Sequence, residues 1–149
     1  MPSSWIQNIY HAVFSTKHRI AAITPQVEER LHPFIGGILK ELRCIPIAIN
    51  GTADHLHVLT IYPSDLCHSD MLRHVKKRSS EWIHKTFAGM SEFAWQEGYG
   101  GFTVSASVMD EVAEYIRRQK EHHKRFDSKA EFIELLRRHG IEFDPKYLE

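Results

Sequence analysis

The chain has 149 residues, and its 19 Lys and Arg are balanced by 19 Asp and Glu, with 11 His in addition. This length is typical of one domain, and we expect a single domain over 1–149 with a C-terminal helical tail over 126–149. Two Cys and the absence of a long apolar run exclude a disulfide framework, a cysteine-rich zinc site and a membrane partner, and predict a cytoplasmic protein.

The apolar pattern predicts strands and helices along the whole chain. In chain order these are a strand over 5–16, a helix over 24–43, strands over 44–50 and 54–62, a helix over 64–87, a strand over 101–105, and helices over 107–124 and 128–139. Thr24 is expected to cap the first helix, which Pro33 and the Gly36–Gly37 pair should weaken or kink.

This order of elements predicts an α+β fold. We expect a ferredoxin-like, RRM-like split β-α-β sandwich with a central antiparallel sheet, helices on one face of it, and extra C-terminal helices. Ser107, with Asp110 three positions on, is expected to cap the helix over 107–124 with the acidic half of a capping box.

Two histidines interrupt the apolar strand in "GTADHLHVLTIYP", residues 51–63. Side chains alternate along a strand, so His55 and His57 point to one face while Leu56 and Val58 point to the other. Two imidazoles on one face can share a metal ion, or they can be ordinary polar residues on a half-exposed sheet.

The helix over 107–124 carries a second group of functional residue types. Tyr115 and Gln119 have the i, i+4 spacing that places side chains on one helix face, and His122 follows one turn later. If this face meets the histidine pair, the two elements supply three neutral metal ligands and a nucleophile. Separately, Tyr115 could be a half-packed boundary aromatic and Gln119 a surface residue.

These motifs resemble the single-tyrosine HUH transposases of small bacterial insertion sequences, including the domesticated relatives associated with repetitive extragenic palindromes. The His-hydrophobic-His motif is His55-Leu56-His57, and "EYIRRQKEHHKR" around Tyr115 and Gln119 is similar to the tyrosine motif of the family. The segments "YHAVFSTKHR" (10–19), "KKRSSEWI" (76–83) and "WQEGYGGFTVS" (95–105) also look like family segments, so the resemblance covers about residues 5–125.

The resemblance implies an enzyme that cleaves and rejoins single-stranded DNA at hairpin-bearing ends without ATP. It implies that Tyr115 attacks the scissile phosphate to form a 5′-phosphotyrosine, and that His55, His57 and Gln119 hold Mg²⁺ or Mn²⁺. It also implies a homodimer, while leaving open whether the tyrosine serves its own chain or the partner's histidine pair.

Two basic runs, 73–85 and 117–125, are candidate phosphate contacts, although the zero net charge of the chain is not typical of a nucleic-acid binder. Taken alone, each run is better explained as a solvated helix face, and the two histidines of the second could cap a helix end. Trp95 and Tyr99 are candidates for stacking on bases, with a core role open for Trp95. The expected DNA-binding residues are Arg73, Lys76, Lys77, Arg78, Arg117, Arg118, Lys120, His122, His123 and Lys124, and the second run continues to Arg125.

Two other function classes remain open from the sequence. The first is a catalytically silent single-stranded nucleic-acid-binding domain of ferredoxin-like fold, which would need no metal. The second is a metal hydrolase or a two-histidine phosphoesterase; the latter needs two His-x-Ser/Thr motifs, and only His84-Lys85-Thr86 fits.

Overall fold

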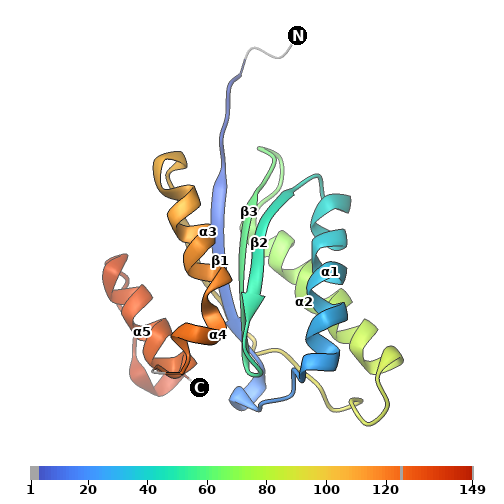
Figure 1. Cartoon of the computed structure of the whole chain (residues 1–149). Coiled ribbons are helices and arrows are strands. Elements are labelled where there is room, and N and C mark those ends of the chain that lie inside the picture. Colours follow the sequence, from blue (N-terminus) through green and yellow to red (C-terminus); the bar gives the residue numbers. More distant parts are fainter. Residues whose placement is uncertain (1–3, 125, 149) are drawn as a thin grey trace.

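A four-stranded antiparallel sheet forms the centre of the protein in the computed structural model, which describes residues 4–124 and 126–148 (Figure 1). The strands are β1 (Ile9–Ser15), β2 (Ile45–Gly51), β3 (His55–Ile61) and β4 (Gly100–Thr103), in the spatial order β2-β3-β1-β4. All three pairings are antiparallel, and the order confirms the predicted split β-α-β sandwich. The first strand is shorter than predicted, because the chain begins to pair with neighbouring strands only at Ile9.

Helices cover both faces of the sheet, so the prediction of helices on one face is wrong. α1 (Pro25–Glu41) and α2 (His68–Thr86) pack on one face, whereas α3 (Met109–Arg117), α4 (Gln119–His122) and α5 (Ser128–Arg138) lie on the other (Figure 1). β1 is therefore buried along its whole length and β3 along nearly all of it, as expected for strands covered on two sides.

α1 follows the predicted capping pattern. The hydroxyl of Thr24 accepts a hydrogen bond from the backbone N–H of Val27 at 3.4 Å. The expected interruption does not occur, since α1 runs as one helix through Pro33 and the glycine pair. Five buried side chains hold it on the core, and this packing outweighs the local cost of proline and glycine: Val27, Leu31, Ile35, Ile38 and Leu39.

The predicted continuous helix over 107–124 is wrong in two respects. A short 3₁₀ turn, η2 (Ala106–Val108), comes first and is capped by Ser105, so Ser107 does not cap α3 and the predicted capping box is absent. The helix then breaks at Arg118 between α3 and α4. The side-chain amide of Asn50, from β2, donates to the carbonyls of Ile116 and Arg117 at 3.0 Å each and so satisfies groups that the break releases.

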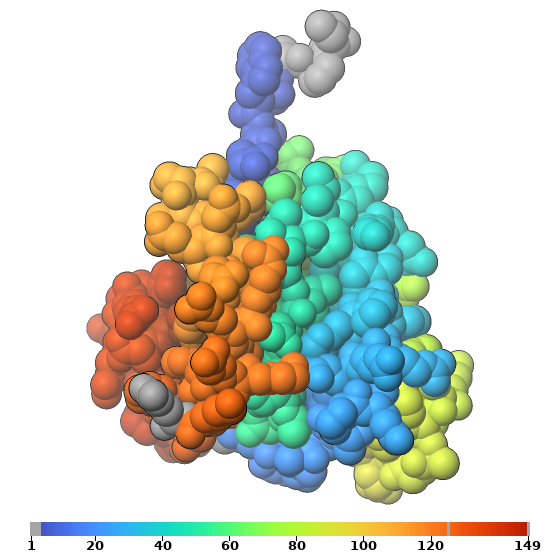
Figure 2. All heavy atoms as spheres, viewed as in Figure 1, coloured from blue at the N-terminus to red at the C-terminus, as the bar shows by residue number. Residues whose placement is uncertain are grey.

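α5 lies against the sheet face that carries α3 and α4. The carboxylate of Asp127 caps its first turn through the N–H of Ala130 at 2.7 Å, and Leu135 and Leu136 pack against Val13 of β1. Figure 2 shows the atoms of α3, α4 and α5 forming one continuous surface. A final 3₁₀ turn, η3 (Pro145–Tyr147), follows, and among the described residues no helix is long and apolar enough to span a bilayer.

Candidate metal and nucleophile site

His55 and His57 of β3 project from the same sheet face, as predicted, toward α3, α4 and α5. Their side chains are 1% and 0% exposed. They do not face the apolar core, because the Nε2 atoms of both rings lie close to one carboxylate oxygen, Glu131 Oε1, at 3.2 and 2.7 Å. The alternation of β3 therefore places both imidazoles in a buried polar cluster.

Both rings are held through their other nitrogen. Nδ1 of His55 lies 3.0 Å from Asp54 Oδ1 and 2.8 Å from the Thr52 hydroxyl. Nδ1 of His57 lies 2.8 Å from Nε2 of His11, a buried residue of β1. Partners of this kind orient the imidazoles of metal sites and leave Nε2 for the ion.

Gln119 and Tyr115 reach the same cluster from either side of the helix break. Gln119 is 0% exposed, and its Oε1 lies 3.1 Å from Nε2 of His55. The ring of Tyr115 lies edge-on to that of His57, with centroids 5.8 Å apart, and its hydroxyl donates a hydrogen bond to Glu131 Oε2. The tyrosine thus lies beside the histidine pair of its own chain.

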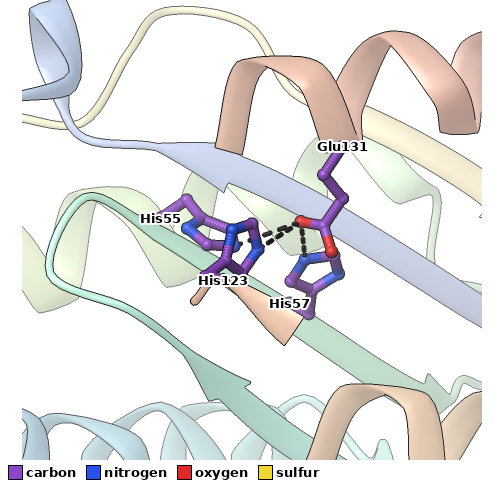
Figure 3. Close-up of side chains that lie close together, drawn as sticks. All are labelled: His55, His57, His123 and Glu131. Carbon is purple, nitrogen blue, oxygen red and sulfur yellow. Dashed lines mark hydrogen bonds and ion pairs between the residues drawn. The ribbon is translucent and has the colours of Figure 1, made fainter. Parts of the chain in front are cut away.

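Two further side chains complete the cluster: Glu131, which was not predicted, and His123, which was expected either to contact phosphate or to cap a helix end. Glu131 Oε1 lies 3.1 Å from Nε2 of His123, and that nitrogen lies 2.9 Å from Gln119 Oε1. Figure 3 shows three imidazoles converging on the carboxylate. One signal was present, because Glu131 occupies a position on the buried stripe of α5, four residues before Leu135, where a charged residue is rare unless it is paired.

The charges in the cluster are strongly coupled. Burial alone would raise the pKa of Glu131, but hydrogen bonds with His123, His55 and His57 outweigh it and hold that pKa well below its usual range. Burial opposes the charged form of His55, yet hydrogen bonds to Asp54 and Glu131 raise its pKa to about 9. Burial and then the negative charge of Glu131 raise the pKa of Tyr115, so its phenol keeps its proton.

The chemistry of the donor set fits a divalent metal ion. One donor atom each from His55, His57, His123 and Glu131 lies within 4.8 Å of the others. Imidazole nitrogen and carboxylate oxygen are common ligands of transition-metal ions. The side chains of this cluster can therefore hold such an ion.

The family model described as "Transposase IS200 like" matches residues 4–119. The chain belongs to this family of transposases. Solved structures agree on the fold. A Deinococcus radiodurans R1 protein described as a transposase is similar at 19% identity with a TM-score of 0.65, over 80% of this chain and 95% of that one. A REP-associated tyrosine transposase bound to a REP hairpin is similar at 15% identity with a TM-score of 0.63, over 83% of this chain and 73% of that one. No curated protein shows a significant match.

In this IS200-like transposase, the basic residues of α2 line a groove against the segment 94–99. Lys76 donates from Nζ to the carbonyls of Glu97 and Gly98, at 3.1 and 2.8 Å, and Lys77 lines the same groove. Arg73 also lines it but forms an ion pair with Asp70 at 3.1 Å. Burial lowers the pKa of Lys76 to about 8.

The remaining candidates on α2 and its groove have specific partners. Arg78 lies 2.7 Å from Glu41 of α1. Trp95 is a core residue, because it is buried and its indole N–H donates to the Ser79 hydroxyl at 2.9 Å. Tyr99 is 36% exposed beside the Lys76 ammonium and is the aromatic of the two that remains available to a base.

The second basic run is largely paired within the protein. Arg118 lies 2.8 Å from Glu114, and Lys120 lies 2.6 Å from Glu28. The ring of His122 stacks on Phe126, with Nε2 3.4 Å from Glu131 Oε2. Two further residues of the run are exposed, Arg117 and Lys124, and Arg125 lies outside the described residues.

His84 belongs to the one motif that fits a two-histidine phosphoesterase. It lies on α2, on the opposite side of the sheet from the cluster. Its Nε2 lies 2.7 Å from the carbonyl oxygen of Phe93, which gives it a structural partner. The buried histidine cluster and the family match favour the transposase over that alternative.

Proposed function

We propose that this transposase cleaves and rejoins single-stranded DNA at hairpin-bearing ends through a 5′-phosphotyrosine on Tyr115. One observation carries the proposal: Tyr115, Gln119 and the two imidazoles of His55 and His57 meet at a single carboxylate within one chain. This meeting supports the proposal, because phosphodiester cleavage of this kind requires a nucleophile beside the metal ligands.

Tyr115 performs the covalent step in this proposal. Its phenolic oxygen forms a bond to phosphorus, the bond from phosphorus to the 3′ oxygen breaks, and the 3′ oxygen takes up a proton to leave as a hydroxyl. The phenolic proton must pass to an acceptor, since the pKa of Tyr115 is raised in the resting chain. The phosphotyrosine conserves the bond energy, so another 3′ hydroxyl can reverse the step and join new ends.

His55, His57 and Gln119 would hold the divalent ion, Mg²⁺ or Mn²⁺, that the family resemblance implies. When bound, such an ion neutralises charge on the scissile phosphate. The protein fixes the donors beforehand: Asp54 and His11 hold the two imidazoles, and Gln119 donates from Nε2 to Glu131 Oε2 at 3.0 Å.

The DNA would approach the nucleophile through the surface hollow that Tyr115 lines. This hollow has a volume of about 930 Å³ and is bordered by Arg118, His122 and Lys124, but also by acidic residues. The groove at Lys76 lies on the α2 side of the sheet, so a strand that contacts both places must pass around an edge of the sheet (Figure 1). We propose that the hairpin occupies the basic groove and the cleaved strand reaches Tyr115.

We further propose that two chains act together. One tyrosine can hold one DNA end at a time, and exchange of ends needs two. Because Tyr115 lies beside the histidine pair of its own chain, each chain of such a dimer would carry a complete site.

The test is a cleavage reaction with a hairpin-bearing single strand and Mn²⁺, read as a protein–DNA adduct on a denaturing gel. The native protein should form the adduct, Tyr115→Phe should form none, and His57→Ala should bind the hairpin without cleaving it. Circular dichroism melts check that both variants fold. Hairpin binding by the native protein without any adduct would instead support the silent DNA-binding domain, and an adduct in Tyr115→Phe would move the nucleophile elsewhere.

A further inference from the structure

The C-terminal part of the chain contributes two side chains to the cluster from outside the family match. The match ends at residue 119, whereas His123 follows α4 and Glu131 lies on α5. We infer that His123 and Glu131 are ligands of the same metal ion as His55, His57 and Gln119. This inference rests on the metal site of the proposed function and extends it to the C-terminal helix.

All three imidazoles share one arrangement. Nδ1 of His55 faces Asp54, Nδ1 of His57 faces His11, and Nδ1 of His123 faces the backbone carbonyl of Phe126 at 2.5 Å. Each ring therefore turns Nε2 toward the common centre. His123 has the same kind of orienting partner as the pair on β3, which is the pattern of a third ligand.

The contacts of His123 direct its Nε2 at the common centre. The carbonyl of Phe126 only accepts, so Nδ1 carries a proton, and in a neutral ring Nε2 then carries a lone pair. That lone pair faces two further acceptors, Gln119 Oε1 at 2.9 Å and Glu131 Oε1 at 3.1 Å.

His55 repeats this arrangement. Its Nδ1 faces the Asp54 carboxylate, while its Nε2 faces Gln119 Oε1 at 3.1 Å and Glu131 Oε1 at 3.2 Å. Acceptors that face one another in a buried site need protons or a cation between them. In the chain without metal, protons on the imidazoles lie between these acceptors, and one divalent ion could replace them and satisfy all of these atoms at once.

Glu131 also connects the ion to the nucleophile. Its Oε1 faces the three imidazoles, while its Oε2 accepts from the Tyr115 hydroxyl and from Gln119 Nε2. The carboxylate is thus a ligand through one oxygen and a positioning group for the phenol through the other. Docking of α5 would then be part of assembling the site.

Direct metal titration tests this assignment without DNA. Mn²⁺ is titrated calorimetrically into the full-length native protein, Glu131→Ala, Glu131→Gln and His123→Ala. The control is Glu134→Ala, an exposed residue of the same helix that pairs only with Arg138 at 3.0 Å. Loss of an orienting partner costs metal sites about 10–100-fold in affinity, so loss of a ligand should weaken binding at least about tenfold. The control should bind as the native protein does.

A second measurement distinguishes the loss of a metal ligand from a general loss of packing. With Co²⁺ as the probe, the visible absorption spectrum should change in shape in Glu131→Gln and His123→Ala, because the ligand set differs, and stay unchanged in Glu134→Ala. Thermal melts without metal identify variants that fail to fold.

The outcomes separate the two proposals. Equal Mn²⁺ affinity in Glu131→Ala, or tighter binding because the carboxylate merely fills the place of the ion, overturns the inference while leaving the site of His55 and His57 intact. Native affinity in His57→Ala would instead remove the metal site of the proposed function itself.

Discussion

His11 shows how a single residue outside the cluster controls a residue inside it. It is buried on β1, and burial followed by the proximity of His57 lowers the pKa of His11 to about 3, so the ring is neutral. A neutral His11 can accept the Nδ1 proton of His57 and so hold the tautomer whose Nε2 is free for a metal ion.

We predict that His11→Phe, which keeps an aromatic ring but removes the acceptor, weakens Mn²⁺ binding by about 10–100-fold. His11→Gln, whose amide oxygen can accept the same proton, should recover part of the loss. Calorimetric titration measures both, and native affinity in His11→Phe would show that His57 needs no such partner.

The orientation of the β3 histidines could be predicted at this scale, because it follows from the two-residue period of a strand. Glu131 could not, because a carboxylate on a short amphipathic helix reveals its partner only when the docking of that helix is known. The same applies to His123, whose ring direction depends on the turn at Phe126.

At the scale of elements, α5 reaches its position through a close approach to β4. A Cβ atom on Gly100 would lie 2.3 Å from Cε1 of Phe132, so only glycine lets the two elements meet as they do. Nothing local in either segment predicts this contact. The sequence reveals the existence of α5 and its N-terminal boundary, but where it docks depends on a long-range fit.

We expect Gly100→Ala to push Phe132 away and loosen α5, at a cost of about 1–3 kcal/mol in the free energy of unfolding. Hydrogen exchange should rise across α5, and Mn²⁺ affinity should fall because Glu131 moves with the helix. Gly98→Ala is the matched control, since a Cβ there meets nothing within 4 Å. Equal exchange in both variants would show that Gly100 does not govern docking.

The break between α3 and α4 has a similar explanation. The helical periodicity of 107–124 predicts one continuous helix, whereas the side chain of Asn50 on β2 stabilises the break at Arg118. Tyr115 and Gln119 nevertheless both contact Glu131 beside the histidine pair. The side chains therefore lie together as predicted, although the predicted continuous helix is wrong.

Across the whole molecule, the formal net charge is zero, but the charged residues are not evenly distributed. Basic residues gather in the groove of α2, on the opposite side of the sheet from the buried histidine cluster. Lys76 is a pH-sensitive charge in that groove, since burial lowers its pKa to about 8. A group with this pKa is mostly charged at pH 7 and mostly neutral at pH 9.

We therefore predict that hairpin binding loses about one phosphate contact between pH 7 and pH 9. The slope of log affinity against log salt should become shallower by about 0.7–0.9. Lys76→Arg, which stays charged over this range, should keep its slope. Fluorescence anisotropy at several salt concentrations measures it, and a parallel change in both proteins would assign the pH effect to another group.

In the proposed mechanism, Tyr115 and the histidine pair of the same chain act on one phosphate. The most direct measurement mixes two inactive variants, Tyr115→Phe and His57→Ala, with the hairpin-bearing strand and Mn²⁺, beside the native protein as positive control. We predict an adduct from the native protein and none from the mixture, because neither chain then carries a complete site. An adduct on the His57→Ala chain would rule out cleavage within one chain, because its Tyr115 would have used the histidines of another chain.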